Sequence, residues 1–145
     1  MINESRLDIY DYIKSLLVGV TKNIYSMFVP EELTNDDLTN GFIVIRLGEI
    51  NDRSEFRGQA FASVRAFVQA YIPSKSRGRL DKTKYKAFET GISQAIETEI
   101  DNSANENEYF SIVSDGILSM DDKDDSTQDN PFFIYIKSFI VQIDN

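Results

Sequence analysis

The spacing of apolar residues predicts a helix near the start of the chain. From Ser5 onward, apolar side chains recur every three or four residues, which is the period of one helix face. We expect this helix to run from about residue 4 to about residue 20. A polar connection containing Pro30 follows, with a short extended piece expected at 23–29. The apolar stripe of the helix consists of Ile9, Ile13, Leu16, Leu17, Val20 and Ile24.

Two stretches in the first half of the chain predict strands. Residues 42–50 are rich in β-branched side chains. In residues 58–72, every second position from Ala60 to Ile72 is small and apolar, and the positions between them mix aromatic with polar side chains. We call each of these two alternating sets of positions a parity of the strand. The apolar parity would let a helix lie close, whereas the mixed parity is typical of surfaces that meet another protein. The candidate interface residues of the mixed parity are Phe61, Arg65, Phe67 and Tyr71.

The second half of the chain predicts one more helix and two more strands. Asp81 is a suitable N-cap for a helix that ends near Glu99, and residues 101–108 are expected to form a loop. Residues 109–119 and 132–143 should form an antiparallel hairpin. The sequence therefore predicts a single α+β domain over residues 1–145. In it, a four-stranded, mainly antiparallel sheet carries two helices on one face, in the order α-β-β-α-β-β.

Composition narrows the range of functions. The 145 residues include 24 acidic and 15 basic side chains, so the net charge is −9. A protein whose whole surface binds nucleic acid would carry a positive charge instead. There is no cysteine and no histidine, which excludes disulfides, thiolate nucleophiles, zinc-finger sites and Ser-His-Asp triads. An enzyme built from this sequence would need Asp, Glu, Lys or Tyr as its acid and base. Neither a GxxxxGK(S/T) nor a GxGxxG motif follows a predicted strand, so we expect no cofactor. The most apolar stretch, 132–143, is interrupted by Lys137 and is too short to span a membrane, so we expect a soluble intracellular protein.

An acidic segment and a basic segment are the strongest charge features. Residues 121–129 fail the calcium-loop pattern, because Ser126 stands where glycine is needed and Phe132 where a bidentate glutamate is needed. We therefore interpret the segment as a solvated acidic loop without a metal. Its candidate contact residues are Asp121, Asp122, Asp124 and Asp125.

The basic segment, residues 75–86, holds six of the fifteen basic side chains and one acid, Asp81. Three lysines fall in the opening turns of the predicted helix, where the helix dipole disfavours positive charge. Local stability does not explain them, which leaves a hydrated turn, a phosphate backbone or an acidic patch on another subunit as alternatives. The candidate contact residues are Lys75, Arg77, Arg79 and Lys82.

Residues 132–143 carry more apolar surface than one covered sheet face requires. Both parities are largely apolar, although a sheet with helices on one face needs only one apolar parity. The surplus packs either against a returning loop of the same chain or against a neighbouring chain. We favour the second interpretation.

Several local patterns occur in a recognisable order. Asn23-Ile24-Tyr25 is followed by Pro30, and the hydrophobic run from Phe42 ends in Gly48-Glu49. A long strand, a helix and a closing strand pair complete the order. In this arrangement the chain resembles the tail-completion, or tail terminator, proteins of long-tailed bacteriophages and related prophages. It departs from them at Gly41, where they usually have proline, and in the acidic segment.

The resemblance implies a non-enzymatic virion protein, present in the bacterial cytoplasm during assembly and then in the virion tail. Its copies would close into a ring, commonly a hexamer, that caps the tail tube and joins it to the head-tail connector proteins. Nucleic acid is expected only as DNA passing through the ring, and no membrane is involved. Since a ring needs two unlike patches on each copy, we predict that residues 75–86 of one copy face 121–129 of the next.

Two other classes stay open. The protein could be a cytoplasmic, non-enzymatic binding module that uses Phe61, Phe67 and Tyr71 to hold a peptide or small ligand. It could also be a carboxylate-dependent metal enzyme, which divalent metal would stabilise against heating.

Overall fold

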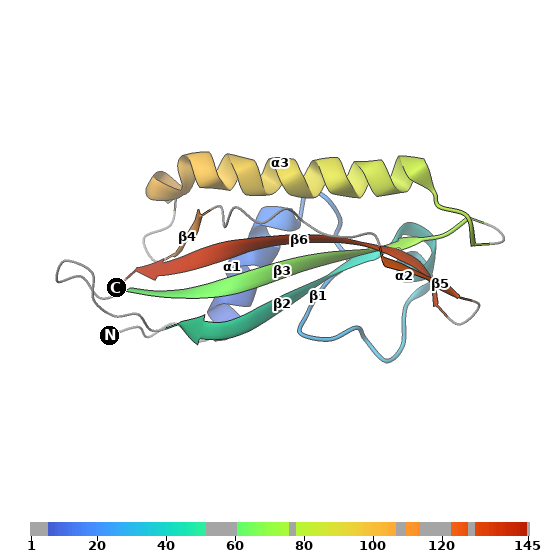
Figure 1. Cartoon of the computed structure of the whole chain (residues 1–145), viewed down its shortest axis with the longest axis horizontal. Coiled ribbons are helices and arrows are strands. Elements are labelled where there is room, and N and C mark those ends of the chain that lie inside the picture. Colours follow the sequence, from blue (N-terminus) through green and yellow to red (C-terminus); the bar gives the residue numbers. More distant parts are fainter. Residues whose placement is uncertain are drawn as a thin grey trace.

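The computed structural model describes residues 6–51, 61–75, 78–106, 110–113, 123–127 and 130–144 (Figure 1). Side chains are described for 7–48, 63–75, 78–100, 112 and 132–142. The elements in this part are α1 (Arg6–Leu17), β1 (Ile24–Ser26), α2 (Asn35–Asn40), β2 (Phe42–Asn51), β3 (Phe61–Pro73), α3 (Lys82–Glu106), β4 (Phe110–Val113), β5 (Lys123–Thr127) and β6 (Asn130–Asp144).

One mixed sheet organises the described part of the chain. Its strand order is β1-β2-β3-β6-β4, and β5 also pairs with β6. β1 runs parallel to β2, and the other strand pairs of the described residues are antiparallel. The predicted α+β class is therefore confirmed. The sheet is mixed and has more than the four strands expected, because the extended piece at 23–29 joins it as β1 and part of the acidic segment joins it as β5.

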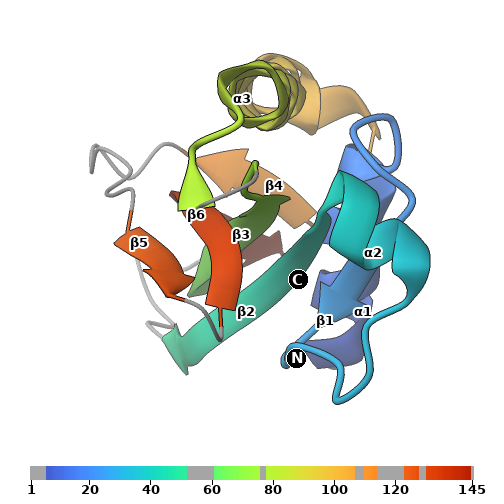
Figure 2. The ribbon, with the colours of Figure 1, turned by 90° about the vertical axis from the view of Figure 1, so that its right-hand side faces the viewer.

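Both long helices lie on the same face of the sheet (Figure 2), as predicted. The small apolar parity of β3 points to this face, and Val64, Ala66, Val68, Ala70 and Ile72 are at most 1% exposed. Two of these positions are alanines, whose small side chains project little from the sheet, so that helices can pack closely against it. α1 contributes Ile9, Ile13 and Leu17 to the hydrophobic core on this face, and α3 contributes Phe88, Ile92 and Ile96. Each such side chain stabilises the fold by about 1.5–3 kcal/mol.

Some predicted boundaries are wrong. α1 ends at Leu17, whose carbonyl oxygen accepts hydrogen bonds from the N–H groups of Val20 and Thr21, so the expected continuation to residue 20 is a turn. α3 continues to Glu106 through most of the loop expected at 101–108. β4 covers residues 110–113 of the strand expected at 109–119, and the other residues of that stretch lie outside the described residues.

α2 lies in a segment that was expected to be a connection. Its N-cap is Thr34, whose side chain accepts a hydrogen bond from the N–H of Asp37 at 3.1 Å. The Asp37 carboxylate in turn accepts from the N–H of Thr34 at 3.0 Å. This reciprocal capping satisfies two backbone donors that a six-residue helix would otherwise leave open.

A second, smaller core lies on the other face of the sheet, at the end beside α2. Phe42, Val44 and Phe132 are buried there, and Tyr25, Leu33 and Tyr71 pack against them. Gly41 makes this possible, since its φ is +90° and a Cβ would lie 2.6 Å from the carbonyl oxygen of Tyr71. Only glycine adopts that conformation in that space without strain.

Candidate functional site

Beyond the smaller core, the second face of the sheet continues as a surface that no described helix covers. The strand register places Arg46, Phe67 and Ser138 in one row across β2, β3 and β6, with Arg65 beside Ile140 in the next row. All of these side chains are half-buried. We call this surface the open sheet face; it consists of Arg46, Arg65, Phe67, Gln69, Ile136 and Ile140.

The mixed parity of β3 points to the open sheet face, as its alternation predicts. Phe67 and Arg65 lie on it. Tyr71 belongs to the smaller core, because its ring stacks on Phe42 with centroids 4.8 Å apart. The side chain of Phe61 lies outside the described residues. Part of the aromatic surface proposed for contact with other molecules is therefore used within the chain.

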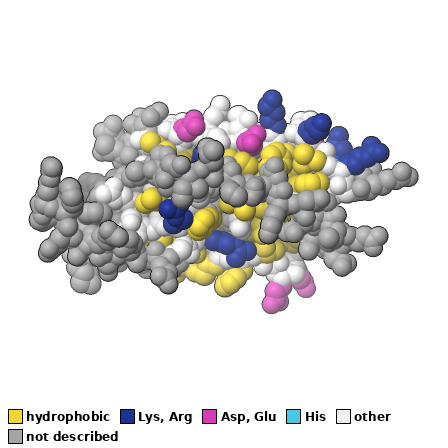
Figure 3. Space-filling view, viewed as in Figure 1, with side chains coloured by type: hydrophobic (Ala, Val, Ile, Leu, Met, Phe, Trp, Pro, Cys, Tyr) yellow, Lys and Arg dark blue, Asp and Glu magenta, His cyan; other side chains and the backbone are white. Residues whose placement is uncertain are grey.

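The basic segment forms a tight turn and the first turns of α3. The N–H of Lys75 donates to the carbonyl oxygen of Arg79 at 2.6 Å, and the Lys75, Arg79 and Lys82 side chains are exposed, whereas Arg77 lies outside the described residues. Asp81 caps α3 by accepting from the N–H of Lys84 at 3.2 Å, as predicted. Lys and Arg side chains gather over the start of α3 in Figure 3.

One of these lysines stabilises the fold, which the sequence interpretation missed. The Nζ of Lys84 donates to the carbonyl oxygen of Thr39 at 2.6 Å, near the C-terminal end of α2. The bond satisfies a carbonyl group that the short helix leaves without an internal partner.

The acidic segment lies at the same end of the molecule as the basic segment. The expectation of a loop is wrong for residues 123–127, which form β5, whereas Asp121 and Asp122 lie outside the described residues. The backbone of Asp124 and Asp125 pairs with β6 at Phe133 and Phe132, which in turn pair with the end of β3. Two strand spacings, roughly 10 Å, thus separate β5 from the strand that leads into the basic turn. Segments placed side by side in one chain are less suited to join two copies than segments on opposite sides.

An exposed loop, residues 27–33, connects β1 to α2, and we call it the Phe28 loop. Its base is closed by the hydroxyl of Tyr25, which donates to both carboxylate oxygens of the buried Asp37 at 2.8 and 2.9 Å. The guanidinium of Arg46 donates to the carbonyl oxygen of Met27 at 3.0 Å. These bonds fix the loop at its base, while Phe28 itself is 71% exposed.

The backbone at Met27 has an unusual conformation. Its φ is +76°, and the N–H of Phe28 donates to the carbonyl oxygen of Ser26 at 2.9 Å, which defines a tight three-residue turn. Such a turn is strained by about 1–3 kcal/mol for a residue other than glycine. The turn directs the chain away from the sheet immediately before Phe28.

The groups at the base of the loop titrate abnormally. Burial, the hydrogen bond to Asp37 and the charge of that carboxylate raise the pKa of Tyr25 to about 12. Hydrogen bonds from the Asn23 and Asn40 side-chain amides lower the pKa of Asp36. The Tyr25 hydroxyl therefore keeps its proton, and its hydrogen bond to Asp37, to a higher pH than an ordinary tyrosine would.

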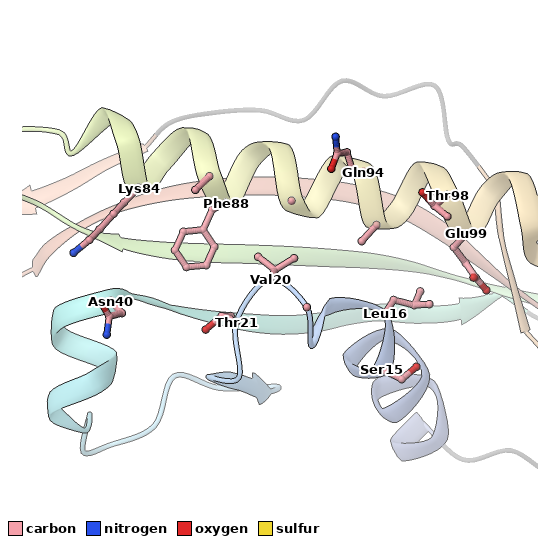
Figure 4. Close-up of a pocket in the computed structure, with 14 residues that line it drawn as sticks. Ser15, Leu16, Val20, Thr21, Asn40, Lys84, Phe88, Gln94, Thr98 and Glu99 are labelled. Atoms are coloured by element: carbon pink, nitrogen blue, oxygen red, sulfur yellow. The ribbon is translucent and has the colours of Figure 1, made fainter.

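A crevice of about 800 Å³ lies between α3 and the turn that follows α1 (Figure 4). Leu16, Val20 and Phe88 give it apolar walls, and Figure 4 shows Lys84 near one end and Glu99 near the other. A second hollow of about 650 Å³ adjoins it along the outer side of α3, lined by Lys82, Thr83, Lys86, Ala87, Thr90, Gly91 and Gln94. Volumes of roughly 300–1,000 Å³ are usual for binding sites.

One end of the crevice is built on a buried carboxylate. Glu99 is 4% exposed, and its Oε2 accepts a hydrogen bond from the hydroxyl of Tyr12 at 2.5 Å, which links α3 to α1. Midway along, a Cβ on Gly91 would lie 3.2 Å from a methyl group of Val20, so glycine permits the close approach of α3 to the turn. Sequence analysis missed Tyr12 and Glu99 because they are 87 residues apart and belong to no motif.

The described residues form two surfaces suited to binding, the open sheet face and the crevice. Among them, no three acidic side chains come together as a metal site. None of the described helices is long and apolar enough to cross a membrane. No protein-family model matches the chain, and no curated protein matches it significantly.

Proposed function

We propose that the protein is a structural subunit of a bacteriophage or prophage tail. Its copies form a ring that ends the tail tube and joins it to the head. The protein acts in the bacterial cytoplasm during assembly and remains in the virion tail. The order of elements and the sequence patterns that resemble tail terminators are the reason for naming this class.

The observation that carries the proposal is the open sheet face. α1 and α3 both pack on the opposite face, and the smaller core occupies only the end of the sheet beside α2. Phe67, Ile136 and Ile140 are half-buried on this face, where Arg46 pairs with Phe67 and Arg65 pairs with Ile140 in the strand register. A mixture of aromatic, aliphatic and arginine side chains is typical of surfaces that contact other proteins.

Gel filtration coupled to light scattering, followed by electron microscopy of the eluted particles, tests the proposal. We expect closed rings of several chains. Phe67→Gln should weaken the assembly, because it replaces an apolar contact with a polar one on a face that already carries Gln69. Glu89→Gln, on the exposed side of α3, is the matched control and should leave the particle unchanged. A particle of one or two chains at every concentration would contradict the proposal and favour the alternative binding module.

A further inference from the structure

We infer that the Phe28 loop of one copy docks into the crevice between α1 and α3 of a second copy, with its glutamates against the lysines of α3. This inference rests on the proposed function, because it names a contact between neighbouring subunits in addition to the open sheet face. It replaces residues 121–129 with the Phe28 loop as the acidic partner of the basic segment.

The first argument is that the loop presents an apolar anchor that the chain itself leaves unused. Phe28 is 71% exposed and Val29 is 36% exposed, so the two neighbours form an apolar pair on the surface of the loop. Tyr25, Asp37 and Arg46 hold the loop base in place. A loop fixed before binding loses little conformational entropy when it binds.

The second argument is the match of charge and polarity along the two surfaces. In the loop, Phe28 and Val29 are followed after Pro30 by Glu31 and Glu32, both exposed. On the receiving side, the apolar walls of the crevice adjoin a hollow that carries the exposed Lys82 and Lys86. An apolar pair followed by two acids thus matches an apolar crevice bordered by two bases, and such complementarity gives an interface its specificity.

The third argument is position. In Figures 1 and 2, the connection between β1 and α2 lies below the sheet, whereas α3 runs above it. Figure 3 shows basic side chains over the start of α3, and acidic side chains both at the lower edge of the molecule and along the upper side. The crevice is lined by α3, by Asn40 and by the end of α1 with its following turn, and none of the residues of the Phe28 loop lines it. Between copies they make a head-to-tail contact, which is the type that closes rings.

Chemical cross-linking tests the contact directly, because the natural chain contains no cysteine. Two single variants, Val29→Cys and Gln94→Cys, are mixed and treated with a short thiol-specific cross-linker. We expect covalent dimers in the mixture and none with either variant alone. Leu7→Cys mixed with Gln94→Cys is the matched control, since Leu7 is 58% exposed on α1 and belongs to neither surface.

Substitutions give the energetic test. Phe28→Ala should weaken self-association about 30-fold, the effect of removing one dominant aromatic anchor. Ala87→Tyr, which fills the crevice from an exposed helix position, should do the same. Mixing these two variants should yield dimers that grow no further, because each pair retains one intact contact. Reversing charge at Lys82 and Lys86 should weaken assembly, and reversing it at Glu31 and Glu32 as well should restore it.

The outcomes separate the inference from the proposed function. Rings that lose stability with Phe28→Ala, together with the cross-link between positions 29 and 94, support both. Rings that are unaffected by Phe28→Ala and lack the cross-link overturn the docking and leave the ring intact. Cross-linked open chains or pairs, without closed rings, support the docking and overturn the ring. A wild-type protein that stays monomeric and gives no cross-link overturns both.

Discussion

The bond between Tyr25 and Asp37 should be a main support of the Phe28 loop. Tyr25→Phe removes the hydroxyl that donates to both oxygens of a fully buried carboxylate. The carboxylate would keep the hydrogen bond from the N–H of Thr34 at 3.0 Å. Hydrogen bonds to charged groups contribute about 1.5–3 kcal/mol, and we expect the free energy of unfolding to fall by that amount.

The same pair predicts a dependence on alkaline pH. The pKa of Tyr25 is raised from 10 to about 12 in the folded protein, so between these values the folded state holds a proton that the unfolded state has lost. Stability from this group is therefore fully present below pH 10 and falls as the pH rises toward 12. The Tyr25→Phe variant lacks the titrating hydroxyl, and its stability should fall less over this range.

Urea denaturation at neutral pH and between pH 10 and 12 measures both effects. Tyr71→Phe is the matched control, because it keeps the ring stacked on Phe42 and should change stability by less than about 0.5 kcal/mol. A double-mutant cycle with Asp37→Asn isolates the coupling between the two side chains. A loss for Tyr25→Phe no larger than that of Tyr71→Phe, or an unchanged alkaline slope, would refute the reasoning.

The remaining predictions concern the two cores and are checked by urea denaturation. Gly41→Ala should destabilise by more than about 2 kcal/mol, because the new Cβ meets a backbone oxygen at 2.6 Å and φ is +90°; a smaller loss would mean that β2 can shift. Tyr12→Phe should cost about 1.5–3 kcal/mol by removing the donor to the buried Glu99, and a neutral result would show that another donor replaces it. Ile92→Ala should cost about 2–5 kcal/mol, against less than about 0.5 kcal/mol for the exposed Leu38→Ala; equal losses would contradict the assigned packing of α3.

The strand that alternates strictly was the most predictable part of the fold. The alternation in β3 predicts which of its side chains face the helices. It thereby also predicts which face of the sheet the helices cover. The apolar stripe containing Phe88 and Ile92 likewise predicted a helix that packs on that face. These elements were predictable because their periodicity reflects which side of the element is buried.

Features stabilised by distant or polar contacts were less predictable. α2 depends on the reciprocal capping between Thr34 and Asp37, a pattern present in the sequence but embedded in a polar stretch without apolar period. β5 is rich in aspartate, which is uncommon in strands, and its pairing with β6 overrides that preference.

The candidate site was predictable only in part. Alternation placed Arg65 and Phe67 on one face, but it could not show that Tyr71 stacks on Phe42. The Phe28 loop carries no motif, and its importance depends on an exposed fraction and on hydrogen bonds between residues separated along the chain. Such features require the coordinates of all the participating elements.

Sedimentation velocity across a wide range of protein concentration tests most directly whether this domain works by joining copies of itself. The wild type should sediment as a single closed species of several chains, and Phe67→Gln and Phe28→Ala should each shift it toward the mass of one chain, 16.6 kDa. A wild type that sediments as one chain at every concentration, with both variants indistinguishable from it, would contradict the account.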